Sequence, residues 1–251
     1  MNIGIMGCGN IASSLHECMH DMKVLAVFDR HLDRAESVAR SLGGSATDSF
    51  ECFLKYELDL VIEVASVEAV SRYAWEILSK GCELIILSSG ALSDRAFKEE
   101  LEGLARQKQV KVHVPSGAIF GLDNAGIGQM GGLEQVRLRT FKPARSFGLS
   151  SSDKRCIFQG GAYECIKGFP KNTNVAVSLS LATGIEAEVE LWADPQAESI
   201  SHEIVMEGEF GSVEIKVKNK TSKKNPSTSY LAVLSICALL SSMQKPLQIG
   251  S

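Results

Sequence analysis

The sequence predicts an α/β fold, in which a Rossmann-type doubly wound parallel sheet is joined to a second α+β domain with a mainly antiparallel sheet. Three observations predict it. Short apolar runs alternate with amphipathic stretches as far as about residue 114, as expected for strands buried on both faces of a parallel sheet. A glycine-rich turn directly follows the first run. Later runs alternate polar and apolar residues, which is typical of strands with one solvated face.

Five apolar runs in the first part are expected strands. They read NIGIM, VLAVFD, DLVIEVA, ELIILSS and VKVHV. The stretches 34–42, 67–78 and 93–106 between them have helical spacing, and Ser93 is the expected N-cap of the last one. Strands and helices that alternate in this order form a parallel sheet with right-handed crossovers.

The later part is expected to hold four strands, at 133–141, 188–194, 202–210 and 212–219. Residues 208–211 have the composition of a hairpin turn between the last two, and 172–181 is an expected helix. Asn225-Pro226 is expected to begin a final helix that returns to the first domain. The predicted domains are therefore 1–114 with 226–251, which bind the dinucleotide, and 115–225, which serves catalysis, substrate binding and dimerisation.

Composition excludes several classes of protein. The chain has 26 Lys+Arg against 30 Asp+Glu, so bulk charge gives no support for nucleic-acid binding. Its seven cysteines include no C-x-x-C pair, which indicates neither a disulfide framework nor a zinc ribbon and favours a cytoplasmic location. The apolar stretch 230–243 is interrupted by serines and is shorter than the roughly 20 residues of a membrane span. We expect no nucleic-acid or membrane partner and no bound metal.

The glycine-rich turn at residues 7–12 reads G-x-G-x-x-A and opens an expected amphipathic helix. In a dinucleotide-binding turn the first glycine permits a tight turn, the second lets the pyrophosphate approach the backbone, and the alanine keeps the helix near the sheet. The alternative is a chance glycine turn. If the turn binds a dinucleotide, its expected contacts are Gly7, Gly9, Asn10 and Ile11.

Asp29, at the end of the second expected strand, is the acidic residue expected to bind the adenosine ribose hydroxyls, which favours NAD. Arg30, with Arg34 nearby, offers charge to a 2′-phosphate, so NADP is the second candidate. The nicotinamide end should lie at the loops after the fourth and fifth strands, because ligands bind at the carboxyl ends of an open sheet. Those loops carry Ala65, Ser66 and Ser89, although Ser66 and Ser89 are equally well explained as helix starts.

Four motifs in the second half carry a family resemblance: HVPSGAIFGLD (113–123), FPKNTNVA (169–176), ADP with SHEIVMEGEFG (193–211), and NPSTSYLAVLS (225–235). Together with the glycine-rich turn, they resemble the L-aspartate dehydrogenase family. The resemblance implies NAD(P)-dependent oxidation of L-aspartate to iminoaspartate, which hydrolyses to oxaloacetate or feeds quinolinate and NAD synthesis. It also implies that Ala118 and Asn174 contact the cofactor and that His202 is the active-site histidine. Phe120 and Gly161 depart from the family pattern, and Phe120 adds bulk near the expected nicotinamide site.

Oxidation of an amino acid requires a proton acceptor and, for a dicarboxylic substrate, at least one cation. Histidine suits the first role because its ordinary pKa is near 6.5, and His202 is the expected general base, acting on the ammonium or on water that attacks the imine. A satisfied structural histidine is the alternative. Lys171 is expected to bind a substrate carboxylate, against the alternative of a solvent-facing lysine, and Lys142 and Arg145 are weaker candidates.

Two further functions remain open at this point. One keeps the fold but acts on a related imino or aldehyde acid as an NAD(P)-dependent reductase. The other is a non-catalytic dinucleotide-binding regulatory protein. In each case the half-solvated sheet of the second domain offers a face that a second copy can cover, so we expect a homodimer.

Overall fold

The computed structural model describes residues 1–19, 22–149, 152–170, 173–222 and 225–247. The chain divides into two compact units, Met1–Pro115 and Ser116–Ser251. The predicted boundary at residue 114 lies one residue from this division. The last helix belongs to the second of these units, so its predicted return to the first domain stays a prediction.

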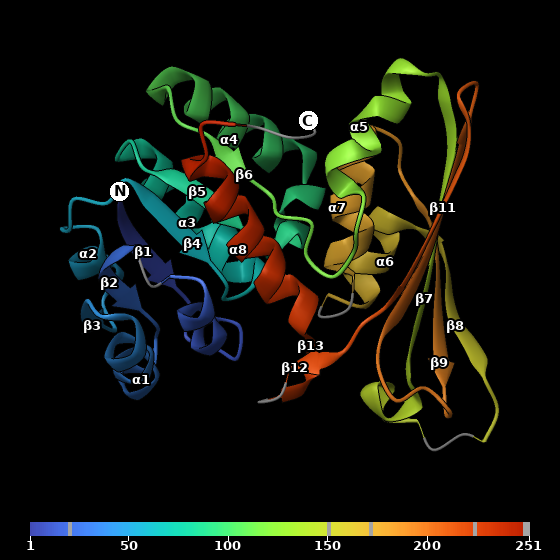
Figure 1. Ribbon diagram of the computed structural model, residues 1–251, viewed down its shortest axis with the longest axis horizontal. Helices are drawn as coiled ribbons and strands as arrows, with labels where there is room; N and C mark the ends of the chain where they lie inside the picture. The colour runs from blue at the N-terminus through green and yellow to red at the C-terminus, as the bar shows by residue number, and fades with distance from the viewer. Residues whose placement is uncertain (20–21, 150–151, 171–172, 223–224, 248–251) are drawn as a thin grey trace. The chain divides into compact units, whose positions relative to one another are not determined.

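The first unit contains a six-stranded sheet with the order β3-β2-β1-β4-β5-β6 (Figure 1). All neighbouring strands are parallel. The strands are β1 (Asn2–Met6), β2 (Lys23–Phe28), β3 (Ser45–Thr47), β4 (Leu60–Glu63), β5 (Glu83–Ile86) and β6 (Val112–His113). The order reverses between β1 and β4, and ligands of such sheets bind at the carboxyl ends of the strands beside this point. The predicted Rossmann-type sheet is confirmed, and only the three-residue β3 was missed.

The helices of this unit follow the predicted spacing with small changes. They are η1 (Ala12–Glu17), α1 (Leu32–Leu42), α2 (Phe50–Phe53), α3 (Val67–Ser79), η2 (Ser89–Ser93) and α4 (Arg95–Lys108). The N-cap of α4 was predicted wrongly. Asp94 caps it, because its carboxylate accepts a hydrogen bond from the Phe97 N–H at 3.1 Å, whereas Ser93 ends the short helix η2 and donates its hydroxyl to the Gly90 carbonyl at 2.7 Å.

The segment after the glycine-rich turn is a 3-10 helix of six residues rather than the expected longer amphipathic helix. The hydroxyls of Ser13 and Ser14 donate to the carbonyls of Gly9 and Asn10, at 3.1 and 3.3 Å. Side chains that bond locally to the backbone in this way compete with regular α-helix. Such a short element has little macrodipole, so the turn itself must carry any interaction with phosphates.

The second unit is built on a five-stranded sheet with the order β11-β10-β7-β9-β8. Its strands are β7 (Leu133–Pro143), β8 (Arg155–Gly161), β9 (Glu188–Asp194), β10 (Ser201–Gly208) and β11 (Gly211–Lys218). Strands β7 and β9 pair in parallel and the other neighbours are antiparallel. The mainly antiparallel sheet and the hairpin between β10 and β11 are therefore confirmed, and β8 was missed.

One face of this sheet is covered by α5 (Leu122–Met130), α6 (Ala162–Gly168) and α7 (Asn174–Thr183) (Figure 1). Alternate residues of the strands, such as Leu138 and Ile204, form a buried core with these helices. Their neighbours in the strands, such as Arg137 and Arg139, turn to the other face. This alternation places all even-numbered side chains of β7 from Val136 to Lys142 on the buried side.

The last helix, α8, spans Tyr230–Gln244. Its predicted start at Asn225-Pro226 is wrong, because these residues belong to strand β13 (Asn225–Ser229), which pairs with β12 (Thr221–Ser222). The backbone N–H of Tyr230 donates to the Lys220 carbonyl at 3.1 Å, just where the helix begins. Strand pairing thus overrides the local preference of proline for a helix start. No helix among the described residues is long and apolar enough to cross a membrane.

Candidate active site

The glycine-rich turn of the first unit lies between β1 and η1, at the carboxyl edge of the sheet. Gly7 has a φ of 98°, and a Cβ atom there would lie 2.6 Å from both Cα and Cβ of Ala65. Only glycine fits this position. Gly9 is exposed, and an added Cβ would meet no atom of the described residues within 4 Å. The space beside the Gly9 backbone is therefore open, as the approach of a pyrophosphate requires.

Asp29 follows β2 and is oriented by two backbone groups. Its Oδ2 accepts a hydrogen bond from the Cys8 N–H at 2.8 Å, and its Oδ1 accepts one from the His31 N–H at 2.9 Å. This places a carboxylate beside the glycine-rich turn, where a dinucleotide presents its adenosine ribose. Arg30 and Arg34 are both exposed.

The thiol of Cys8, within the glycine-rich turn, has a raised pKa. Burial raises its pKa to about 12, the charge of Asp29 acts in the same direction, and Arg34 opposes them. The thiol therefore stays protonated and neutral at physiological pH, and adds no negative charge where phosphates would bind.

The loops after β4 and β5 hold the residues expected near the nicotinamide. Ala65 is exposed, and Ser66 caps α3 by accepting a hydrogen bond from the Ala69 N–H at 3.2 Å. Ser89 is buried at the start of η2. Ser66 thus starts a helix, as one interpretation of the sequence expected, and its contact with the nicotinamide stays a prediction. It also shows that Glu63, a buried carboxylate which sequence reasoning missed, bonds to both loops.

His202 lies on β10 in the second unit and is only 2% exposed. It is paired across the sheet with Thr140 of β7, and its Nδ1 shares a hydrogen bond of 2.9 Å with Thr140 Oγ1. Burial lowers the pKa of His202 to about 3, and the positive charge of Lys142 adds to the effect. The imidazole is therefore neutral at physiological pH, the state in which it accepts a proton.

Lys142 lies two residues beyond Thr140 on the same buried face of β7 and is 5% exposed. Burial lowers the pKa of its ammonium group to about 8, while nearby Cys165 acts in the opposite direction. Cys165 itself is fully buried, and burial raises the pKa of its thiol to about 12. The burial of Lys142 could be predicted from the sequence, because this residue continues the series of alternate positions in β7 that face the core.

The other predicted site residues of the second unit are Lys171, Asn174 and Ala118. Lys171 lies outside the described residues. Asn174 begins α7. Ala118 lies in the loop before α5, where its carbonyl accepts a hydrogen bond from Asn219 Nδ2 at 3.0 Å. Ser235 Oγ accepts another from the adjacent Gly117 N–H at 3.1 Å. Sequence reasoning had not singled out Asn219 or Ser235 as supports of this loop.

The two departures from the family pattern have different surroundings. Phe120 is 65% exposed, so its ring does not contribute to the core of the second unit. At Gly161 an added Cβ would overlap the Glu186 carboxylate, which accepts a hydrogen bond from the Tyr163 N–H at 3.0 Å. A side chain at this position would therefore require the Glu186 carboxylate to move. Among the described residues, no group of three or more His, Cys, Asp or Glu side chains is arranged to hold a metal ion.

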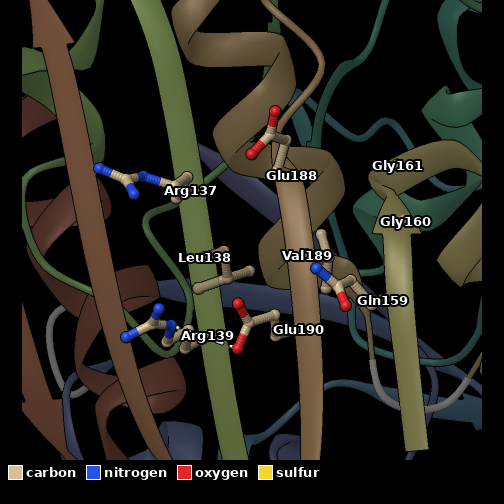
Figure 2. A pocket seen from close by; sticks show the side chains of 9 residues that line it. All are labelled: Arg137, Leu138, Arg139, Gln159, Gly160, Gly161, Glu188, Val189 and Glu190. Carbon is tan, nitrogen blue, oxygen red and sulfur yellow. Dashed lines mark ion pairs between the residues drawn. The ribbon is translucent and has the colours of Figure 1, made fainter. Parts of the chain in front are cut away.

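The outer face of the second sheet carries a pocket of about 410 Å³ (Figure 2). It is lined by Arg137, Leu138, Arg139, Gln159, Gly160, Gly161, Glu188, Val189 and Glu190. Arg139 pairs with Glu190 at 3.2 Å, and Arg137 with Glu207 at 2.8 Å. Because strand residues alternate between faces, these charges lie opposite the face that carries His202.

The fold and these residues define a class: an NAD(P)-dependent oxidoreductase with a Rossmann-type unit and a second unit that holds a buried imidazole and ammonium group. Residues 7–115 match the family model described as homoserine dehydrogenase, NAD binding domain, and residues 123–243 match that of the aspartate dehydrogenase C-terminal domain. With the full-length relatives described next, these matches show that the chain belongs to the L-aspartate dehydrogenase family.

Similarity to individual family members extends over the whole chain. The L-aspartate dehydrogenase of Methanospirillum hungatei is 45% identical over 100% of both chains. That of Methanothermobacter thermautotrophicus is 40% identical over 100% of this chain and 99% of its own. The crystal structure of aspartate dehydrogenase from Thermotoga maritima superposes with a TM-score of 0.84 at 30% identity, covering 100% of this chain and 99% of that one.

Two substitutions in the glycine-rich turn should separate folding from cofactor binding. Gly9→Ala adds a methyl group in open space, so it should leave the melting temperature unchanged and weaken NADH binding about tenfold or more, by blocking the close backbone approach of the pyrophosphate. Gly7→Ala should instead destabilise the protein by about 2 kcal/mol, because it combines backbone strain with overpacking. Thermal unfolding and NADH fluorescence titration measure both effects, and an unchanged NADH affinity in Gly9→Ala would contradict the assignment.

Proposed function

We propose that this chain catalyses the NAD(P)-dependent oxidation of L-aspartate to iminoaspartate, which hydrolyses to oxaloacetate or feeds quinolinate and NAD synthesis. The observation that carries the proposal is the full-length similarity to proteins named L-aspartate dehydrogenase, at up to 45% identity in the comparisons above. The buried pair of His202 and Lys142 supports it, because the reaction needs a proton acceptor and a cation for a dicarboxylic substrate.

The residues of the first unit fit a dinucleotide. In this proposal the open backbone at Gly9, with Asn10 and Ile11, receives the pyrophosphate, and Asp29 binds the adenosine ribose hydroxyls, which favours NAD over NADP. The nicotinamide half is assigned to a set of small residues: Ala65, Ser66, Ser89, Ala118 and Asn174. When bound, the nicotinamide accepts a hydride from the substrate Cα.

We assign His202 the role of general base. The substrate ammonium must lose a proton before the Cα–H bond gives up its hydride, and a neutral imidazole is able to accept that proton. If the Nδ1–H of His202 donates to Thr140 Oγ1, the lone pair of Nε2 is free for this step. Once that proton has passed to solvent, the neutral imidazole is able to accept a proton from the water that attacks the imine carbon, a step that leads to the release of ammonia.

The low pKa of His202 sets a condition on this chemistry. An imidazole with a pKa of about 3 is a weak base. Burial is the larger cause of this depression and the charge of Lys142 the smaller one, so a substrate carboxylate bound to Lys142 would offset the smaller part and make the imidazole more basic. Substrate binding and activation of the base are thereby coupled. Lys171, which lies outside the described residues, remains the proposed partner of a substrate carboxylate from the sequence.

The test of this function is an assay with purified protein. NADH formation from NAD and L-aspartate should be measurable at 340 nm, and His202→Ala should abolish turnover while NADH binding changes little, because the imidazole moves a proton and does not hold the cofactor. His16→Ala is the matched control, since His16 lies on η1 in the first unit. Undiminished turnover in His202→Ala would remove this residue from the mechanism, and no turnover with aspartate in the parent would refute the function.

Lys142→Met should raise KM for L-aspartate about tenfold or more and leave KM for NAD unchanged, because a charge-assisted hydrogen bond to the substrate is lost. Lys167→Met, a change of the same type at an exposed residue of α6, should have no such effect. Protection against thermal unfolding by succinate, measured in the presence of NADH, gives a readout independent of turnover. Equal values of KM for aspartate in Lys142→Met and the parent would exclude Lys142 from substrate binding.

We further propose a cytoplasmic homodimer formed through the outer face of the second sheet. That face carries both signs of charge around its pocket, and an interface between two copies related by a two-fold axis needs such a mixture in order to be self-complementary.

Reversal of one charge at this face should weaken the dimer. Arg139→Glu breaks the pair with Glu190 and sets like charges together at the interface, so sedimentation velocity should show a shift from dimer to monomer at micromolar concentration. Arg95→Glu, on the exposed helix α4, is the matched control and should stay dimeric. A dimer that persists in Arg139→Glu at the same affinity would show that another surface is used, and a monomeric parent would refute the proposal altogether.

A further inference from the structure

We propose that Glu63 is a positioning residue, which holds the three loops after β1, β4 and β5 in the arrangement that binds the dinucleotide. The inference rests on the proposed assignment of these loops to the cofactor and deepens it. Glu63 ends β4, a strand whose other residues are Leu60, Val61 and Ile62. It is 0% exposed, so it is an ionisable group in a place where an apolar residue would suffice for packing.

The carboxylate joins two loops that are far apart in the sequence. Its Oε1 accepts hydrogen bonds from the Ala65 N–H at 2.7 Å and from the Ser88 hydroxyl at 2.8 Å. Its Oε2 accepts a hydrogen bond from the Ser88 N–H at 2.9 Å. Ala65 begins the loop after β4, and Ser88 lies in the loop after β5. One side chain therefore fixes the distance between the two loops assigned to the nicotinamide half.

The third loop is coupled through Ala65. Gly7 of the glycine-rich turn packs tightly on Ala65. A Cβ atom added to Gly7 would lie 2.6 Å from the Cα of Ala65 and 2.7 Å from its backbone nitrogen. The Val64 N–H also donates to the Met6 carbonyl at 2.9 Å. A movement of Ala65 must consequently move the turn assigned to the pyrophosphate, because close-packed atoms have no free space to absorb it.

The hydrogen-bond pattern explains why this residue is a carboxylic acid. Backbone N–H groups only donate, and one of them points at each oxygen of Glu63. A carboxylate accepts at both oxygens, whereas the amide of glutamine must turn its NH₂ group toward one of these donors. Burial raises the pKa of Glu63, and the hydrogen bonds from Ser88 and Ala65 oppose the rise. These donors therefore favour the ionised carboxylate and offset part of the cost of burying it.

The test measures NADH affinity by fluorescence titration, with thermal unfolding as the second readout. Glu63→Gln should raise the Kd for NADH about tenfold, because one buried charge-assisted hydrogen bond is replaced by two opposed donors. Ser88→Ala removes only the hydroxyl donor and should raise the Kd about threefold. Glu83→Gln is the matched control: this acid begins β5, bonds to His113 at 2.9 Å, and should leave the Kd unchanged.

The double variant Glu63→Gln/Ser88→Ala separates positioning from general destabilisation. If Glu63 acts through Ser88, the effects on NADH affinity are not additive, and the double variant should bind NADH as Glu63→Gln does. Additive effects, or an unchanged Kd in Glu63→Gln, would overturn the proposal. Should Glu63→Gln fail to fold, the milder Ser88→Ala decides, and an unchanged Kd there is the overturning result. Because binding is read without aspartate, a parent that binds NADH but does not oxidise aspartate refutes only the proposed substrate.

Discussion

The close approach of Gly7 to Ala65 is the constraint on which the first unit depends. It brings the turn after β1 against the loop after β4, at the point where the strand order reverses. Glu63 then ties the same loop to the one after β5. Together these contacts join three loops that are far apart in the sequence into one edge of the sheet. A dinucleotide needs such an edge, because its pyrophosphate and nicotinamide must be held by different loops at a fixed separation.

The second unit holds two ionisable side chains on the buried face of its sheet. His202 and Lys142 occupy neighbouring places on the buried face of one sheet, where burial lowers the pKa of both, and the charge of Lys142 lowers that of His202 further. Such an arrangement is costly for stability alone, since buried charges require compensation. In the proposed function an anionic substrate supplies this compensation, so that His202 becomes a stronger base when the substrate binds.

Much of the fold and part of the site followed from the sequence. The apolar runs of the first unit predicted its strands, and the positions of Gly7 and Asp29 predicted a turn and an acid that the structure places side by side, linked by the Cys8 N–H. The short β3 and the end strand β8 were not predicted, because the sequence of neither shows a clear alternation of polar and apolar residues. The start of α8 was misplaced at Asn225-Pro226, because strand pairing with β12, a contact invisible to local propensity, uses these residues differently.

By itself, the sequence determined the class of fold, the family and the glycine-rich turn, because these depend on hydrophobic period and on residue types that few other contexts require. Only the tertiary structure decided that Glu63 links two loops, that Lys142 accompanies His202, and that Thr140 orients the imidazole. These facts join residues far apart in the chain, from 25 residues for Glu63 and Ser88 to 62 for Thr140 and His202. Burial and hydrogen bonding between distant segments arise from packing, which a local pattern of residues does not encode.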